Sequence, residues 1–268
     1  MTEQEVLKRL RDDSEYYGPF GKQYLSASNV KQLISKPTEF GLVEKTLALI
    51  QGRYFHLYML EPDKINEIPV HDSKSRVTKA FKDFTLENNL DQYDVLLQKE
   101  RDHMLKLCDK MKANLEISEL VYDTDVQYEV PAIKQIEGVM WKGKCDVLNP
   151  NPFQLEIEDQ DTGEMQVLDY PDGAIIDLKT SSDVHKFKWS CREYCYDAQA
   201  YIYSTLFNKP FVFIVVDKKN GAMKIAPTTT DFIDRGREKV KKAVRVYNKF
   251  FSDDKTHEIS NYVYTEAL

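Results

Sequence analysis

The stretch Ala174-Ile175-Ile176-Asp177-Leu178-Lys179 decides the fold of this chain. A short apolar run of this kind is typical of a strand buried at the centre of a sheet. Side chains alternate along a strand, so we expect Asp177 and Lys179 on one face and Leu178 on the other. Charges at the end of a buried strand are costly unless they are paired or bind a metal ion. The presence of Asp177 and Lys179 at this position therefore needs a reason, such as coordination of a metal ion.

Asp146 is the expected partner of Asp177. Residues 127–136 and 139–148 alternate between apolar and polar side chains, and Glu137-Gly138 lies between them. This pattern predicts a β-hairpin whose second strand ends near Asp146. If that strand neighbours the strand of Asp177, both carboxylates reach the same end of the sheet, where oxygen ligands suit a hard divalent cation.

An acidic segment accounts for the distance along the chain between the two aspartates. Residues 154–170 predict a second hairpin that turns around Asp161-Thr162-Gly163. We interpret it as an insertion between two neighbouring strands.

The remaining segments predict helices around this sheet. The expected elements are a short helix through residues 29–34 capped by Ser26 or Ser28 and stopped by Pro37, a helix from Thr38 to about Leu60, two charged helices within 75–115, a helix at 197–207, a buried strand at 211–216, a turn at Asn220-Gly221 into 222–226, and a final helix at 230–251. This order predicts an α/β fold with a mixed central β-sheet flanked by helices. We expect one domain over 1–268, with a mainly helical part at 1–120, the sheet-containing core at 121–252 and a tail at 253–268.

Composition agrees with a packed protein, because 42% of the 268 residues are hydrophobic and 12% are aromatic. The sequence has neither a long apolar run nor the pattern of a signal peptide, so a soluble, intracellular protein without membrane partners is expected. A net charge of −7 does not favour nucleic-acid binding, although a local basic channel is compatible with it.

The four cysteines, Cys108, Cys145, Cys191 and Cys195, do not follow zinc-finger spacing. Reduced thiols packed in the core are the first interpretation. Ligation of an iron–sulfur cluster is the alternative.

Three short motifs together resemble a known superfamily. Asp146, Asp177-Leu178-Lys179 and Gln199-Ala200-Tyr201-Ile202-Tyr203 resemble the PD-(D/E)XK nucleases that carry the Gln-x-x-x-Tyr element of recombination exonucleases. Upstream, the segments 25–28, 36–40 and 52–62 resemble the start of phage RecE-like exonucleases, also called exodeoxyribonuclease VIII. The resemblance spans about residues 25–205. It departs from the superfamily pattern at Cys145, because that pattern has a proline directly before the first aspartate.

The resemblance implies roles for seven residues and a restriction-endonuclease-like fold. Lys179 would position the attacking water, while Gln199 and Tyr203, which share one helix face, would approach the active site. The implied metal ligands are Asp146, Asp177, the Leu178 carbonyl and His56, and Glu129 is a further candidate. A structural histidine and an ordinary exposed strand glutamate are the alternatives for His56 and Glu129.

The implied activity is that of a Mg²⁺-dependent deoxyribonuclease, with Mn²⁺ as a possible substitute. It would act as an exonuclease that resects double-stranded DNA ends for single-strand-annealing recombination. An endonuclease, a structure-specific nuclease, or a catalytically silent DNA-binding or assembly protein are the alternatives. The resemblance also implies a single-strand annealing protein as partner, a homo-oligomeric ring, and the cytoplasm of a bacterial host if the gene belongs to a phage. Polarity and processivity are left open.

A late basic cluster has two interpretations. Arg237, Lys241 and Arg245 share one face of the last expected helix and could follow a phosphate backbone. Asp234 and Glu238 interrupt that face, so a solvated helix is the other interpretation.

Overall fold

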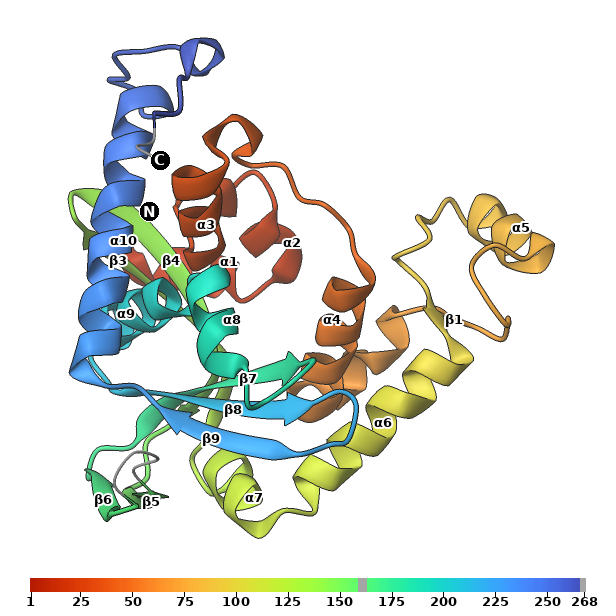
Figure 1. The fold of residues 1–268 in the computed structure, drawn as a ribbon. Coiled ribbons are helices and arrows are strands. Elements are labelled where there is room, and N and C mark those ends of the chain that lie inside the picture. The colour runs from red at the N-terminus through yellow and green to blue at the C-terminus, as the bar shows by residue number, and fades with distance from the viewer. Residues whose placement is uncertain (159–162, 266–268) are drawn as a thin grey trace.

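The computed structural model describes residues 1–158 and 163–265 and confirms an α/β fold with a mixed central sheet (Figure 1). The sheet has five strands in the order β3-β4-β7-β8-β9. Their bounds are β3 Gln127–Ile136, β4 Val139–Asn149, β7 Ala174–Ser181, β8 Phe211–Asp217 and β9 Met223–Pro227. Strands β7 and β8 are parallel and the other neighbours antiparallel. Every residue of β8 is buried, as the apolar run of residues 211–216 predicts.

The β3–β4 hairpin and strand β7 bring the two aspartates together. Ile136 pairs with Val139 around the turn at Glu137-Gly138, where both residues have positive φ. Such a turn matches the natural twist of the two strands. Val147 of β4 pairs with Ile176 of β7, so Asp146 and Asp177 sit one position further along neighbouring strands. The predicted adjacency is confirmed.

Helices cover both faces of the sheet, and each face has its own core. One core includes residues of α4 Leu47–Leu60, α6 Gln98–Lys112 and α7 Leu115–Tyr122. The other includes residues of α3 Ala27–Ser35, α8 Phe187–Glu193, α9 Tyr196–Phe207 and α10 Thr230–Phe250. Helix α10 lies directly against α9, because a Cβ on Gly236 would stand 2.0 Å from the carbonyl oxygen of Asp197.

The helix expected from Thr38 to Leu60 was predicted too long. Only a 3₁₀ turn, Pro37–Glu39, forms at its start, and α4 begins at Leu47. Gly41 adopts a φ of +83°, which a continuing helix does not allow. The side chain of Thr46 then accepts a hydrogen bond from the Leu49 amide and caps the real helix.

The two charged helices predicted within residues 75–115 are confirmed. They are α5 Lys79–Glu87 and α6, and α5 stands away from the sheet (Figure 1). A small core of Phe81, Val95 and Leu97 holds α5 in place. Two short parallel strands, β1 Val70–His71 and β2 Leu96–Leu97, close this excursion.

The acidic insertion forms a separate hairpin of β5 Phe153–Glu158 and β6 Met165–Tyr170. Its strands are confirmed, whereas Asp161 and Thr162 of the predicted turn lie outside the described residues. The remaining elements are α1 Glu3–Leu10, α2 Asp13–Tyr17 and the 3₁₀ turns Gly21–Gln23, Pro62–Glu67 and Ile259–Asn261.

All four cysteines are free and buried, as the packing interpretation predicts. Cys108 lies in the core that contains α4 and α6, while Cys145, Cys191 and Cys195 lie in the core on the other side. The four thiols therefore do not form one cluster site, and the iron–sulfur alternative was wrong. In the described parts of the chain, no helix is both long and apolar enough to span a membrane.

Candidate active site

The regular alternation of side chains along strand β4 is broken at Asp146, and its carboxylate is directed out of the core. Cys145 packs in the core beside α9, but Val147 packs in the opposite core beside α4. In a regular strand these two residues would share one face. The local twist leaves the Asp146 side chain partly exposed, with Oδ2 accepting a hydrogen bond from the Leu178 amide at 2.8 Å.

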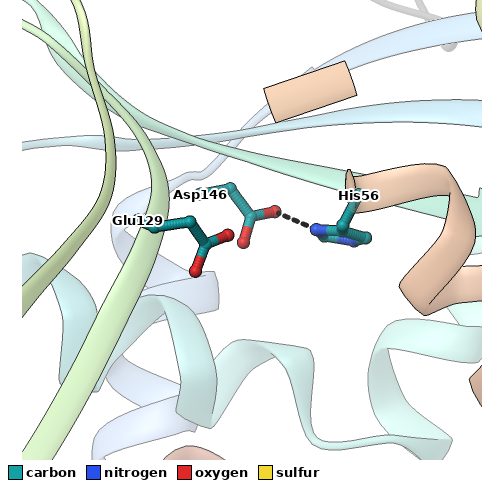
Figure 2. A group of neighbouring side chains, drawn as sticks. All are labelled: His56, Glu129 and Asp146. Carbon is teal, nitrogen blue, oxygen red and sulfur yellow. Dashed lines mark ion pairs between the residues drawn. The ribbon is translucent and has the colours of Figure 1, made fainter. Parts of the chain in front are cut away.

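His56, Glu129 and Asp146 converge on one point (Figure 2). One possible ligand atom from each lies within 4.8 Å of the others. His56 comes from α4, and its Nδ1 lies 3.3 Å from Asp146 Oδ2. Glu129 lies on β3 with a φ of +49°, an uncommon conformation for a residue other than glycine. The backbone at Glu129 therefore departs from a regular strand at the residue that turns its carboxylate toward Asp146.

Asp177 lies beside this group and is held from two sides. Its Oδ2 is 2.5 Å from Lys179 Nζ, and its Oδ1 accepts a hydrogen bond from Gln199 Nε2 at 2.6 Å. Asp177 and Lys179 are two positions apart on β7, so they share a face as predicted. Oδ2 is buried and accepts no well-directed hydrogen bond from the described residues. Its second acceptor position is therefore available to a ligand.

Tyr203 supports the site through the backbone of β4. Its hydroxyl donates a hydrogen bond to the Lys144 carbonyl at 3.2 Å and accepts one from the Lys144 amide at 3.4 Å. Gly143 leaves room for this contact, because a Cβ there would lie 3.2 Å from the Tyr203 ring. Gln199 thus contacts a candidate ligand directly, while Tyr203 contacts the strand that carries Asp146.

Burial and mutual repulsion favour the neutral forms of the carboxyl groups. Burial, strengthened by the charge of Asp146, raises the pKa of Glu129 to about 8. Burial also raises the pKa of Asp146 and of Asp177 to about 6, although the Lys179 charge opposes the rise. A divalent cation would relieve this repulsion.

The two nitrogen groups differ in charge. Burial, followed by the charge of Lys179, lowers the pKa of His56 to about 4, so its imidazole is neutral near pH 7 and able to bind a metal. For Lys179, the charges of Asp177 and Asp146 outweigh the cost of burial and raise the pKa. Lys179 is therefore a fixed positive charge at this site.

Sequence reasoning missed a pair of buried lysines next to the site. Lys142 and Lys144 on β4 are 4% and 7% exposed. Lys142 donates to the Tyr16 carbonyl, and Lys144 pairs with Asp13 of α2 and lies 3.7 Å from Glu129 Oε2. The alternation Lys142, Lys144, Asp146 places three charged residues on one side of a buried strand, and this signal could have found them.

The basic cluster on α10 is partly neutralised. Lys239 pairs with Asp197 at 2.8 Å, and Lys241 pairs with Glu238 at 2.7 Å. Arg237 lies 3.8 Å from Glu137. These contacts favour the solvated-helix interpretation.

The donors present fit a divalent cation. Asp146 and Glu129 supply oxygen atoms and the neutral imidazole of His56 supplies nitrogen, while Asp177 on the neighbouring strand is a further oxygen donor beside them. The Leu178 backbone lies among them, since its amide bonds to Asp146. An oxygen-rich set with one imidazole suits Mg²⁺ and Mn²⁺ better than a soft metal ion.

Comparisons with known proteins support a nuclease. Residues 162–260 match the model of a family described as "PDDEXK-like domain of unknown function (DUF3799)". No curated protein matches the chain in sequence.

Solved structures give the wider fold. The crystal structure titled "Putative exonuclease" from Eubacterium rectale has a TM-score of 0.59 and 17% identity, and the match covers 96% of this chain and 95% of that one. At this identity the likeness concerns the fold. A structure titled "Crystal structure of SSO0001" has a TM-score of 0.29 and 14% identity over 81% of this chain and 84% of that one, too low to carry an argument. The match to the Eubacterium rectale structure spans nearly the whole chain. The segment matched by the family model includes β7, α8 and α9, with Asp177, Lys179 and Gln199. The segment 162–260 is thus similar to a PDDEXK-like domain, and the fold of the whole chain is similar to that of the Eubacterium rectale protein.

Proposed function

We propose that this protein is a divalent-metal-dependent DNA exonuclease that resects double-stranded ends for single-strand-annealing recombination. The observation that carries the proposal is the convergence of His56, Glu129 and Asp146, with the Asp177–Lys179 pair on the neighbouring strand β7. The exonuclease mode rests on the resemblance to RecE-like enzymes and on the fold shared with the Eubacterium rectale protein, which is described as an exonuclease.

Each side chain has a distinct task in this proposal. Asp146, Asp177, Glu129, His56 and the Leu178 carbonyl would hold the cation, either Mg²⁺ or Mn²⁺. A bound divalent cation neutralises phosphate charge and makes a water molecule more acidic.

Lys179, protonated and held by Asp177, places positive charge where negative charge develops on the phosphate. Because its pKa is raised, we assign it to positioning water and stabilising charge rather than to removing a proton. Gln199 fixes the orientation of Asp177 through its 2.6 Å hydrogen bond.

The wider biological setting is also part of the proposal. A single-strand annealing partner, a ring-shaped homo-oligomer and action in the cytoplasm of a bacterial host follow from the resemblance alone. The geometry of the site is compatible with them and independent of them.

Digestion of a linear duplex and a covalently closed circle, side by side, tests this function. The linear duplex carries a label on either the 5′ or the 3′ end, so the order of label release gives the polarity. Mg²⁺-dependent loss of the linear duplex with an intact circle supports an exonuclease. Cleavage of the circle would assign the site to an endonuclease, and wild-type digestion by the Asp146→Asn, Asp177→Asn or Lys179→Ala variant would show that this site is not responsible.

A further inference from the structure

Helix α8 and the corner that follows it present two large aromatic side chains to solvent. Trp189 is 62% exposed and Tyr194 is 48% exposed. The inner face of the same segment is buried through Phe187, Cys191 and Cys195. The exposed aromatics are therefore not needed to anchor the helix, and their rings are available to a ligand.

Cations lie against both aromatic rings. The guanidinium of Arg192 is 5.3 Å from the Trp189 ring centroid, and Nζ of Lys31, from α3, is 4.4 Å from the Tyr194 ring centroid. Within residues 185–194, Lys186, Lys188 and Arg192 outnumber the one acid, Glu193. Asp183 offsets part of this charge by pairing with Lys186 at 3.9 Å. The surface is thus locally basic in a chain with a net charge of −7.

This surface is connected to the candidate active site through Tyr196. The Tyr196 ring lies 5.8 Å from the Tyr194 ring, measured between centroids. Nζ of Lys179 also lies 5.2 Å from the Tyr196 ring centroid. Helix α8 also packs beside α9, which carries Gln199 (Figure 1). A strand that reaches Lys179 would therefore pass close to Tyr194.

We propose that Trp189 and Tyr194 form a stacking platform for the bases of a single nucleic-acid strand, with Lys31, Lys188 and Arg192 contacting its phosphates. Aromatic rings interleaved with cations are the usual means of binding single strands without sequence preference. The assignment rests on the proposed function, because the platform would hold the strand that the active site cuts or leaves behind.

The chemistry of the surface favours a nucleic acid over a protein partner. Throughout residues 183–196, all of which the structure describes, Trp189 and Tyr194 are the only exposed large apolar residues. A protein interface normally has an apolar core around its aromatic anchors. Two separate rings with flanking cations instead match the alternation of bases and phosphates.

Tryptophan fluorescence offers a direct test, because the chain has two tryptophans in opposite settings. Trp141 is fully buried and donates to the Ile136 carbonyl at 3.1 Å, whereas Trp189 is exposed. A single-stranded oligothymidylate is titrated in EDTA, where hydrolysis is not required. We expect quenching of the exposed tryptophan in the wild type and the loss of this quenching in Trp189→Phe, in which only the buried tryptophan still emits.

Affinity measured with a fluorescently labelled oligothymidylate gives the second readout. Loss of one base–aromatic stack corresponds to an affinity about 5- to 150-fold weaker, which we expect for Trp189→Ala, with most of the affinity kept in Trp189→Phe. Leu86→Ala is the matched control, because Leu86 is 82% exposed on α5 and away from the sheet. Circular dichroism confirms that each variant is folded.

The outcomes separate this proposal from the nuclease assignment. Equal oligothymidylate affinity of Trp189→Ala and the wild type, or no binding by the wild type, overturns the platform, and the patch would then be assigned to a protein partner. Digestion of DNA is measured separately. A protein that binds the oligonucleotide through Trp189 but digests no DNA would overturn the proposed function and keep the platform.

Discussion

Replacing Glu129 by glutamine should stabilise the metal-free protein. The Glu129 side chain is 23% exposed, and burial together with the charge of Asp146 raises its pKa to about 8. Glutamine has nearly the same shape but never ionises. The substitution therefore removes an unfavourable charge while it keeps an acceptor near Lys144, whose Nζ lies 3.7 Å away.

The size of the gain follows from the displaced pKa. One pKa unit corresponds to about 1.4 kcal/mol, so full ionisation of Glu129 has an upper cost of several kcal/mol. Partial exposure and relaxation of the neighbours reduce this, and we expect the variant to be about 2 kcal/mol more stable at pH 8.5. For a domain of this size that corresponds to a Tm increase of about 4–8 °C.

The stability gain of Glu129→Gln should increase with pH. The folded-state pKa of Glu129 lies above its ordinary value, so the glutamate has no cost at pH 4.5 and a rising cost as the pH increases toward 8. The gain of Glu129→Gln should therefore be small at pH 5 and full at pH 8.5. Glu156→Gln, an exposed glutamate on β5, is the matched control and should show no such trend.

Thermal unfolding in EDTA at pH 5, 7 and 8.5 checks this expectation. The reasoning is refuted if Glu129→Gln is no more stable than the wild type at pH 8.5, or if its gain is the same at pH 5. A gain with the expected pH dependence shows that ionised Glu129 destabilises the free protein, through its burial and the charge of Asp146.

Three further results are expected. Stabilisation by Mn²⁺, measured as the Tm increase, should grow between pH 6 and pH 8.5. The carboxyl groups must lose protons to bind a cation, and their pKa values lie at about 6 for Asp146 and Asp177 and about 8 for Glu129. A pH-independent increase would contradict this. Gln199→Ala should weaken Mn²⁺ affinity by about 10- to 100-fold in calorimetric titration, since the amide orients Asp177, and unchanged affinity would remove that role. Tyr203→Phe should lower the free energy of unfolding in urea by about 1 kcal/mol through the lost contacts with the Lys144 backbone, and a loss near zero would show that water replaces them.

Periodicity predicts the centre of this fold well. Asp177 and Lys179 share a face because β7 is a regular strand, and the apolar run of β8 is buried along its whole length. The hairpin turn at Glu137-Gly138 was also predictable, since the glycine accepts the positive φ that a two-residue hairpin turn requires.

Features that depend on contacts between distant segments were not predictable in the same way. Helix α2 packs over β4 and buries Lys142 and Lys144. No local pattern in residues 13–17 predicts this packing. The positive φ of Glu129 turns its carboxylate toward Asp146, and period-two alternation does not include such a departure. The start of α4 was missed because Gly41 breaks an otherwise apolar helical pattern.

The rate at which an end-labelled linear duplex is digested, measured against Mg²⁺ concentration for the wild type and Asp177→Asn, tests the central claim most directly. Asp177 is bound by Lys179 and Gln199 and lies beside Asp146, so the site loses a ligand and the partner of its lysine when the charge is removed. We predict digestion by the wild type that rises with Mg²⁺ and disappears in EDTA, and none by a correctly folded Asp177→Asn protein. Equal digestion by both proteins, or digestion by the wild type in EDTA, would contradict the account.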